Sequence, residues 1–195
     1  MKQQIFTKKT TTKELILKYM DVEKFLPFCE SCPNYNKSWS CPPLVFSQRE
    51  FIENYKYADI FVLELTYDEE VIKGAITKEK VMEAIVKYMN PAKERFGELV
   101  VSSESSATNA VTLTCAPCSY CKECTKPMNK PCRFPEKMRY SLDAFHFDVT
   151  MILKDYFGIE LTWASEGLSE KANLLCVMLN DEENEVSLNS VCPMC

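Results

Sequence analysis

The sequence predicts a single α+β domain, residues 1–195, in which helices pack on a small, mostly antiparallel sheet that carries cysteine-rich loops. The chain has 195 residues, 46% of them hydrophobic, which is enough for one domain with a sizeable core. Strand-like and helix-like segments follow one another without regular β-α-β alternation, which is typical of the α+β class. The 11 cysteines fall mainly into local groups, which predicts that those loops have a specific role.

The first third of the chain gives signals for two helices and one strand. Thr11 and Glu14 form a capping-box pattern ahead of an apolar stripe, so a helix is expected to start there. A second helix is expected from Ser47, a good N-cap residue, to Tyr55. Residues 59–67 are rich in β-branched and aromatic types and predict a buried strand.

The middle of the chain predicts helices interrupted near a proline. Residues 81–88 place apolar side chains on one helical face. Asn90 and Pro91 resemble a cap and a first-turn proline, which predicts a new short helix closed by Gly97. Residues 99–114 are ambiguous between helix, loop and a short strand at VTLT.

The last third predicts a long helix and a hairpin. A helical stretch is expected to open at Pro135, and apolar residues at helical spacing continue from Leu142 to Tyr156 before Gly158 ends the helix. Two strand-like runs follow, at 159–164 and 173–179, around a turn at Glu166-Gly167. The acidic residues after them mark the start of an exposed tail, 181–195.

Composition and charge exclude several classes of protein. No apolar run approaches the roughly 18 to 20 residues that cross a membrane, and the N-terminus lacks the apolar core of a signal peptide, so we expect a cytoplasmic protein. A net charge of −5 argues against a nucleic-acid partner. Because the cytosol keeps thiols reduced and the cysteine count is odd, metal binding is favoured over disulfides.

The strongest motif is the group Cys118, Cys121 and Cys124, spaced C-x2-C-x2-C, with Cys132 eight residues further on. This spacing recurs in the ligands of [4Fe–4S] clusters in bacterial ferredoxins. Zinc is the alternative, since four thiolates also make a tetrahedral site, and buried or spare cysteines are a third interpretation. Three C-x2-C steps, counted from Cys115, offer more thiolates than one zinc uses, which favours the cluster.

A second group, Cys29, Cys32 and Cys41, has the spacing C-x2-C-x8-C and lacks one ligand of a closed site. A closed site is structural or transfers electrons, whereas an open three-cysteine cluster exposes an iron to a substrate and would make the protein an enzyme. Alternatively, Cys29 and Cys32 form a zinc ribbon with the terminal CPMC motif. The missing ligand can be absent, or it can be Cys115, Cys192 or Cys195.

The second cysteine segment is locally basic although the chain is acidic. Cations beside an anionic cluster stabilise it and can steer an acidic redox partner protein, whereas the alternative is an ordinary solvated loop. Only two acidic residues, Glu123 and Glu136, lie among the cations of this segment. The cations are Lys122, Lys126, Lys130, Arg133, Lys137 and Arg139.

Two further side chains are candidates for special roles. His146 is the only histidine and follows Asp143 by three residues, so on a helix the carboxylate can orient the imidazole; a packed or surface histidine is the alternative. Cys176 lies in an apolar run and is expected in the core. No phosphate-binding glycine loop, nucleophile elbow or His-Glu-x-x-His motif is present.

These motifs resemble, in order and over most of the chain, the prokaryotic family of predicted metal-binding proteins called domain of unknown function 2284. The resemblance rests on CESCPNYNKSWSCPP, on CSYCKECTKPMNKPCRFPEKMRYSLDAFHFDV and on the LTW segment. The resemblance implies two sets of metal ligands and no particular reaction. The sets are Cys118, Cys121, Cys124 and Cys132, and Cys29, Cys32 and Cys41. The sequence departs from the family pattern at His146, where glycine is usual, and at Cys115, where a small residue is common.

Overall fold

A computed structural model describes residues 1–161 and 167–188 and has an antiparallel sheet at its centre. The sheet has four strands in the order β1-β2-β4-β3. Every neighbouring pair is antiparallel, and Lys2 faces Thr66 at one end of the β1-β2 ladder. The strands are β1 (Lys2–Thr11), β2 (Tyr57–Thr66), β3 (Val111–Leu113) and β4 (Lys171–Asn180).

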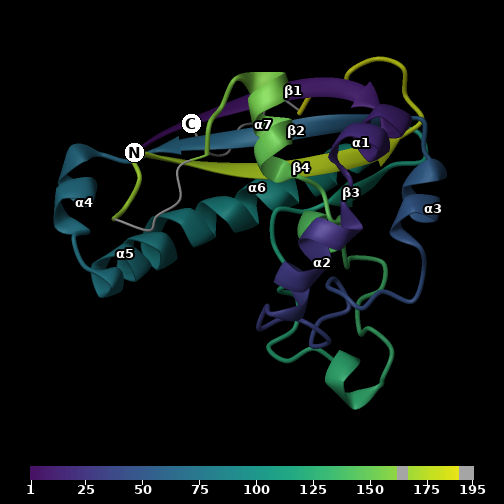
Figure 1. The fold of residues 1–195 in the computed structure, drawn as a ribbon, viewed down its shortest axis with the longest axis horizontal. Coiled ribbons are helices and arrows are strands. Elements are labelled where there is room, and N and C mark those ends of the chain that lie inside the picture. Colours follow the sequence, from purple (N-terminus) through teal and green to yellow (C-terminus); the bar gives the residue numbers. More distant parts are fainter. Residues whose placement is uncertain (162–166, 189–195) are drawn as a thin grey trace.

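Helices cover both faces of this sheet, which confirms the predicted α+β class (Figure 1). Alternate residues of a strand point to opposite faces. Ile60 of β2 therefore packs with α1, α3 and α7, whereas Phe61 packs with α6 on the other side. The helices are α1 (Thr12–Tyr19), α2 (Val22–Glu30), α3 (Gln48–Glu53), α4 (Glu69–Gly74), α5 (Lys78–Ala84), α6 (Asn90–Ser102) and α7 (Val149–Phe157).

Local signals in the sequence place several elements correctly. The Thr11 side chain accepts a hydrogen bond from the Glu14 amide at the start of α1, as a capping residue does. Ser47 caps α3 in the same way through the Glu50 amide. Strand β2 lies within two residues of its prediction, and Gly158 ends α7 with a φ of 67°, a conformation that suits glycine.

Three helix predictions are wrong. A π-helical turn, Ile85–Met89, joins α5 to α6 without the predicted break, although α6 does begin at Asn90 with Pro91 in its first turn. Helix α6 also runs past Gly97 to Ser102. The long helix expected from Leu142 is instead a 3₁₀ turn, Leu142–Phe145, followed by α7, and no helix opens at Pro135.

The predicted hairpin is found in part. Strand β4 contains its second arm, but the ladder partners of β4 in the described residues are β2 and β3. Residues 159–161 have no strand structure, and 162–166, with the rest of the first arm and Glu166 of the turn, lie outside the described residues. Strand β1 and helix α2 are elements that the sequence did not predict.

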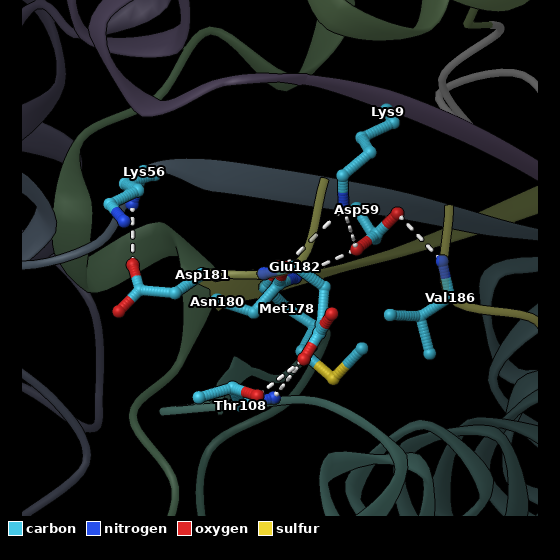
Figure 2. A network of polar contacts seen from close by, with 9 residues as sticks. All are labelled: Lys9, Lys56, Asp59, Thr108, Met178, Asn180, Asp181, Glu182 and Val186. Carbon is cyan, nitrogen blue, oxygen red and sulfur yellow. Dashed lines mark hydrogen bonds and ion pairs between the residues drawn. The ribbon is translucent and has the colours of Figure 1, made fainter. Parts of the chain in front are cut away.

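The segment after β4, expected as an exposed tail, is attached to the sheet at its start (Figure 2). Fully buried Asp59 of β2 accepts hydrogen bonds from Lys9 Nζ at 2.8 Å, Asn180 Nδ2 at 2.7 Å and the Val186 amide at 3.2 Å. Glu182 accepts from the amide and hydroxyl of Thr108. The described part of this segment ends at residue 188, and within it only residues 183–185 and 187 are exposed.

None of the helices among the described residues is long and apolar enough to cross a membrane.

Candidate metal centre

Two cysteine-rich segments, residues 29–43 and 115–135, lie side by side in a lobe below the sheet (Figure 1). The first segment begins on the last turn of α2. The second follows β3 and leads back to the 3₁₀ turn at Leu142–Phe145. We call this region the cysteine lobe.

The first segment brings Cys29, Cys32 and Cys41 close together through tight turns. The Cys32 amide donates to the Cys29 carbonyl at 3.0 Å, and the Cys41 amide donates to the Ser38 carbonyl at 3.1 Å. Cys29 Sγ lies 3.6 Å from the Asp143 carbonyl oxygen. Cys32 is exposed, whereas Cys41 is buried. The three thiols therefore extend from the surface of the lobe into its interior.

The second segment forms a closed loop whose four predicted ligands line one hollow. Cys118, Cys121, Cys124 and Cys132 all border this hollow, with Trp39 from the first segment on its wall. Cys132 reaches the other three because the chain folds back between residues 125 and 133.

Two hydrogen bonds hold that fold-back. The Thr125 hydroxyl donates to the Pro131 carbonyl at 2.8 Å. Arg133 Nη1 donates to the Glu123 carbonyl at 2.7 Å, which brings Cys132 next to the Cys121–Cys124 turn. Asn129 has a φ of 51°, in the left-handed region that asparagine tolerates in turns. The loop geometry thus follows from local polar contacts rather than from a helix or a strand.

The two segments are joined by a buried polar contact at Ser40. The fully buried Ser40 hydroxyl accepts from the Cys118 amide at 2.9 Å and lies 3.7 Å from Cys41 Sγ. The Ser40 carbonyl accepts from the Ser141 amide at 3.0 Å. One residue therefore contacts a cysteine of each set and fixes both to the chain that precedes α7.

A buried lysine makes the second contact between the segments. Lys126 comes from the second segment and donates through Nζ to the carbonyls of Cys41 at 2.7 Å and Pro43 at 2.8 Å. Its ammonium also lies 5.7 Å from the centre of the Trp39 ring. Trp39 Nε1 in turn donates to Thr125 Oγ1 at 3.2 Å. The lobe therefore holds a positive charge inside, between its two sets of thiols.

The environment of the thiols affects their protonation. Burial is the largest cause that raises the pKa of Cys29 to about 11, and Asp143, Cys32 and Cys41 raise it further. Burial also raises the pKa of Cys118, with repulsion from Cys132, Cys121 and Cys124 adding to it. The raised pKa values favour the protonated thiol at Cys29 and at Cys118.

The donor set suits a thiophilic metal. The hollow is bordered by four thiols and by neither a histidine nor a carboxylate, and thiolate donors select zinc, Cu(I) and iron–sulfur clusters. Over residues 1–161 and 167–188, no three Cys, His, Asp or Glu side chains converge closely enough to hold one ion. The four thiols thus border one hollow without converging on a single point.

The predicted cations have different environments. Arg139 forms a two-pronged ion pair with Glu104, at 2.8 and 2.6 Å, which ties the chain just after the second segment to the 3₁₀ turn Ser103–Ser106 that follows α6. Lys126 is buried, so it is not part of a solvated surface. Lys122, Lys130 and Lys137 are exposed.

His146 lies away from the role that a helix would give it. It is buried with a φ of 57°, and within the described part of the chain neither ring nitrogen has a hydrogen-bond partner. Asp143 and His146 are not on an α-helix, so the carboxylate does not orient the imidazole. Burial lowers the pKa of His146, which favours the neutral ring. Cys192 and Cys195 lie outside the described residues.

Comparison with known proteins adds one match. A family model described as "Predicted metal-binding protein (DUF2284)" matches residues 17–179, which span both cysteine segments. The chain belongs to this DUF2284 family. No curated protein and no solved structure matches it. His146 has a φ of 57°, a left-handed conformation that glycine adopts most readily.

Sequence reasoning missed the residues that join the two segments. Ser40 and Trp39 lie inside the first cysteine motif but were assigned no role of their own, and Lys126 was one of six cations in a basic stretch. The prolines that follow Cys41 were the one local sign of a fixed chain there. Contacts across some 80 residues of sequence, such as Ser40 with Cys118 over 78, leave no local pattern.

Proposed function

We propose that this protein holds a [4Fe–4S] cluster on Cys118, Cys121, Cys124 and Cys132 and exchanges electrons with a redox partner protein. The observation that carries the proposal is that these four thiols, spaced as in ferredoxins, border one hollow. When bound, such a cluster accepts and releases one electron at a time. The protein's own residues then hold the cluster, screen its charge and present it to the partner.

Charge in the lobe supports an anionic cluster. Four thiolates give the cluster a net negative charge, and Lys126 places a cation between Cys41 and Cys124 in a region of low exposure. A fixed positive charge stabilises the reduced, more negative state and so raises the reduction potential. Zinc with four thiolates is also anionic, so charge alone does not select iron.

The rim of the hollow supports a protein partner. Tyr120 and Phe134 line the hollow and are also exposed, at 48% and 37% of their surface. Exposed Lys122, Lys130 and Lys137 belong to the same segment. Aromatic side chains beside cations form a surface that an acidic protein can dock on, close to the site of electron transfer.

Anaerobic reconstitution tests the proposal. Protein purified without oxygen is expected to contain iron and acid-labile sulfide in equal amounts. It should show the sulfur-to-iron charge-transfer absorption of a cluster and give an EPR signal when reduced. Cys121→Ser should lose the cluster. Cys115→Ser is the matched control, because Cys115 lies in the same segment and does not border the hollow. Zinc without iron or sulfide, under the same conditions, would refute the proposal.

A zinc staple at the first segment is the second candidate. Its support is that Cys29, Cys32 and Cys41 are close together and can take a fourth ligand from Cys192 or Cys195. Zinc should then remain on the Cys121→Ser variant and fall when both terminal cysteines become serine. If those serines leave the metal content unchanged, the tail supplies no ligand, and an open cluster at the three cysteines becomes the remaining form of this site.

A further inference from the structure

Two cysteines outside both ligand sets contact each other where β3 ends beside β4. Leu113 of β3 faces Val177 of β4, so the chain after β3 runs past Cys176. The Cys115 amide donates to Cys176 Sγ at 3.3 Å. Cys176 is fully buried, as expected for a core residue, but its sulfur faces a second thiol. Neither the cluster nor the zinc staple needs this pair.

One of these two thiols reaches a cavity. A cavity of about 450 Å³ lies between α6 and residues 114–120, and Cys115 is on its wall. Cys115 is partly exposed, and its Sγ lies 3.9 Å from the Lys93 carbonyl oxygen on α6. Cys118 borders the same cavity, so the pair is next to the candidate cluster. Cys115, which is partly exposed and lines the cavity, is therefore the member of the pair that a molecule in the cavity meets first.

The surroundings give the two sulfurs different protonation. A hydrogen bond from Cys176 is the largest cause that lowers the pKa of Cys115; burial opposes it, and the Lys93 charge lowers it further. Burial raises the pKa of Cys176, which keeps its proton. The thiolate is the reactive form of cysteine, so the accessible sulfur is the nucleophile of the pair.

We propose that Cys115 and Cys176 are a dithiol–disulfide pair that is oxidised by a low-molecular-weight disulfide entering this cavity. The proposal does not depend on the metal, because it uses neither ligand set. The contact between the two residues, the exposure of one sulfur and the cavity in front of it carry the inference. Cys115 lies two residues past the end of β3, and the 3.3 Å contact of its amide with Cys176 Sγ places the two residues next to each other, as a disulfide requires.

The chemistry balances in two exchange steps. The Cys115 thiolate attacks one sulfur of the disulfide RSSR, forms a mixed disulfide Cys115–S–S–R and releases RS⁻, which takes up the proton that Cys115 lost. The Cys176 sulfur then attacks the Cys115 sulfur and releases the second RS⁻, which takes the Cys176 proton. Two thiols become one disulfide while RSSR takes two electrons and becomes two RSH.

Oxidised glutathione is the probe for this reaction. The full chain, reconstituted with iron and sulfide, is incubated with it without oxygen, quenched in acid, alkylated and mapped by peptide mass spectrometry. Wild-type protein is expected to show a Cys115–Cys176 disulfide. Cys176→Ser should instead trap glutathione on Cys115, with a rate at least about tenfold above that of any other cysteine. Cys115→Ser should show neither product.

Several results would overturn the proposal. Glutathione on Cys118 or Cys121 instead of Cys115 would place the reactive sulfur elsewhere, and a wild-type protein without the Cys115–Cys176 link would show that the pair does not close. Should Cys176→Ser not fold, the comparison of wild type with Cys115→Ser still decides. Iron and sulfide are also measured on Cys115→Ser, which separates the two proposals. Failure to bind the cluster refutes the proposed cluster only, because the disulfide exchange is measured independently on wild-type protein.

Discussion

Replacing Lys126 with methionine tests whether the buried ammonium joins the two cysteine segments. Only 7% of Lys126 is exposed, and its Nζ donates to the carbonyls of Cys41 and Pro43. Methionine has a similar length and fills the same space without a charge or a donor. The variant therefore removes the polar contacts and keeps most of the packing.

The expected loss of stability follows from those two hydrogen bonds. A hydrogen bond from a charged donor contributes about 1.5–3 kcal/mol, so the two bonds set an upper range of about 3–6 kcal/mol. The variant also avoids the cost of burying an ammonium, and burial does lower the pKa of Lys126. We therefore expect a net loss of about 2 kcal/mol in the free energy of unfolding, which moves the urea midpoint by about 1 M.

Trp39 fluorescence in urea is the assay. Trp39 contacts both segments of the lobe and so reports on their separation, and the other tryptophan, Trp163, is changed to phenylalanine in every sample. Lys122→Met is the matched control, because it removes the same charge from an exposed position of the same loop. It should change the free energy by less than about 0.5 kcal/mol.

The same pair of variants has a second readout in reconstituted protein. The reduction potential should fall more for Lys126→Met than for Lys122→Met, because a charge in the interior is screened less than one in water. Equal urea midpoints and equal potentials for the two variants would refute the reasoning, since the buried position would then have no advantage over the exposed one.

Three further outcomes follow from the described contacts. Asp59→Ala leaves the Lys9 ammonium, 13% exposed, without its carboxylate. We expect the free energy of unfolding to fall by about 3–5 kcal/mol and Tm, measured by calorimetry, to fall by about 10 °C. Glu69→Gln is the control, because its ion pair is exposed to water, and it should stay within about 0.5 kcal/mol of wild type. Glu104→Gln breaks the ion pair with Arg139 and should lower the urea midpoint of the Trp39 signal, and an unchanged midpoint would show that the pair does not anchor the loop. Because the pKa of Cys29 is raised to about 11, metal binding must displace protons, so affinity for Co(II), read from its thiolate absorption, should fall steeply from about pH 8 to about pH 6; a flat profile would contradict protonated thiols.

The elements that the sequence predicted correctly are those with signals a few residues long. The caps at Thr11 and Ser47 and the stop at Gly158 depend on backbone groups within three or four residues. Strand β2 is buried on both faces, so its composition alone identifies it. Strand β1 was missed because it pairs only with β2, at the edge of the sheet, and carries lysine and glutamine as edge strands do.

The single long helix expected from Leu142 was wrong because hydrophobic periodicity says nothing about backbone dihedrals. Residues 142–156 keep an apolar stripe. The positive φ at His146 nevertheless ends the 3₁₀ turn Leu142–Phe145, and α7 begins separately at Val149. Helix α2 was missed because Pro27 and Cys29 interrupt its pattern. At the candidate site, spacing grouped the cysteines, but the contacts of Ser40 and Lys126 depend on the tertiary fold.

The position of Ser40 determines how Cys118 is held in the lobe. The fully buried Ser40 hydroxyl accepts from the Cys118 amide, and the Ser40 carbonyl accepts from the Ser141 amide, so Cys118 is fixed to the chain that leads to α7. Cys121, Cys124 and Cys132 belong to a loop that closes on itself and is also joined to the first segment through Trp39 and Lys126. The loop is therefore held at two joints, at Ser40 beside Cys118 and at Lys126 beside Cys41. Because Lys126 lies in the second segment and donates to carbonyls of the first, we expect a substitution that loosens one cysteine segment to disturb the other.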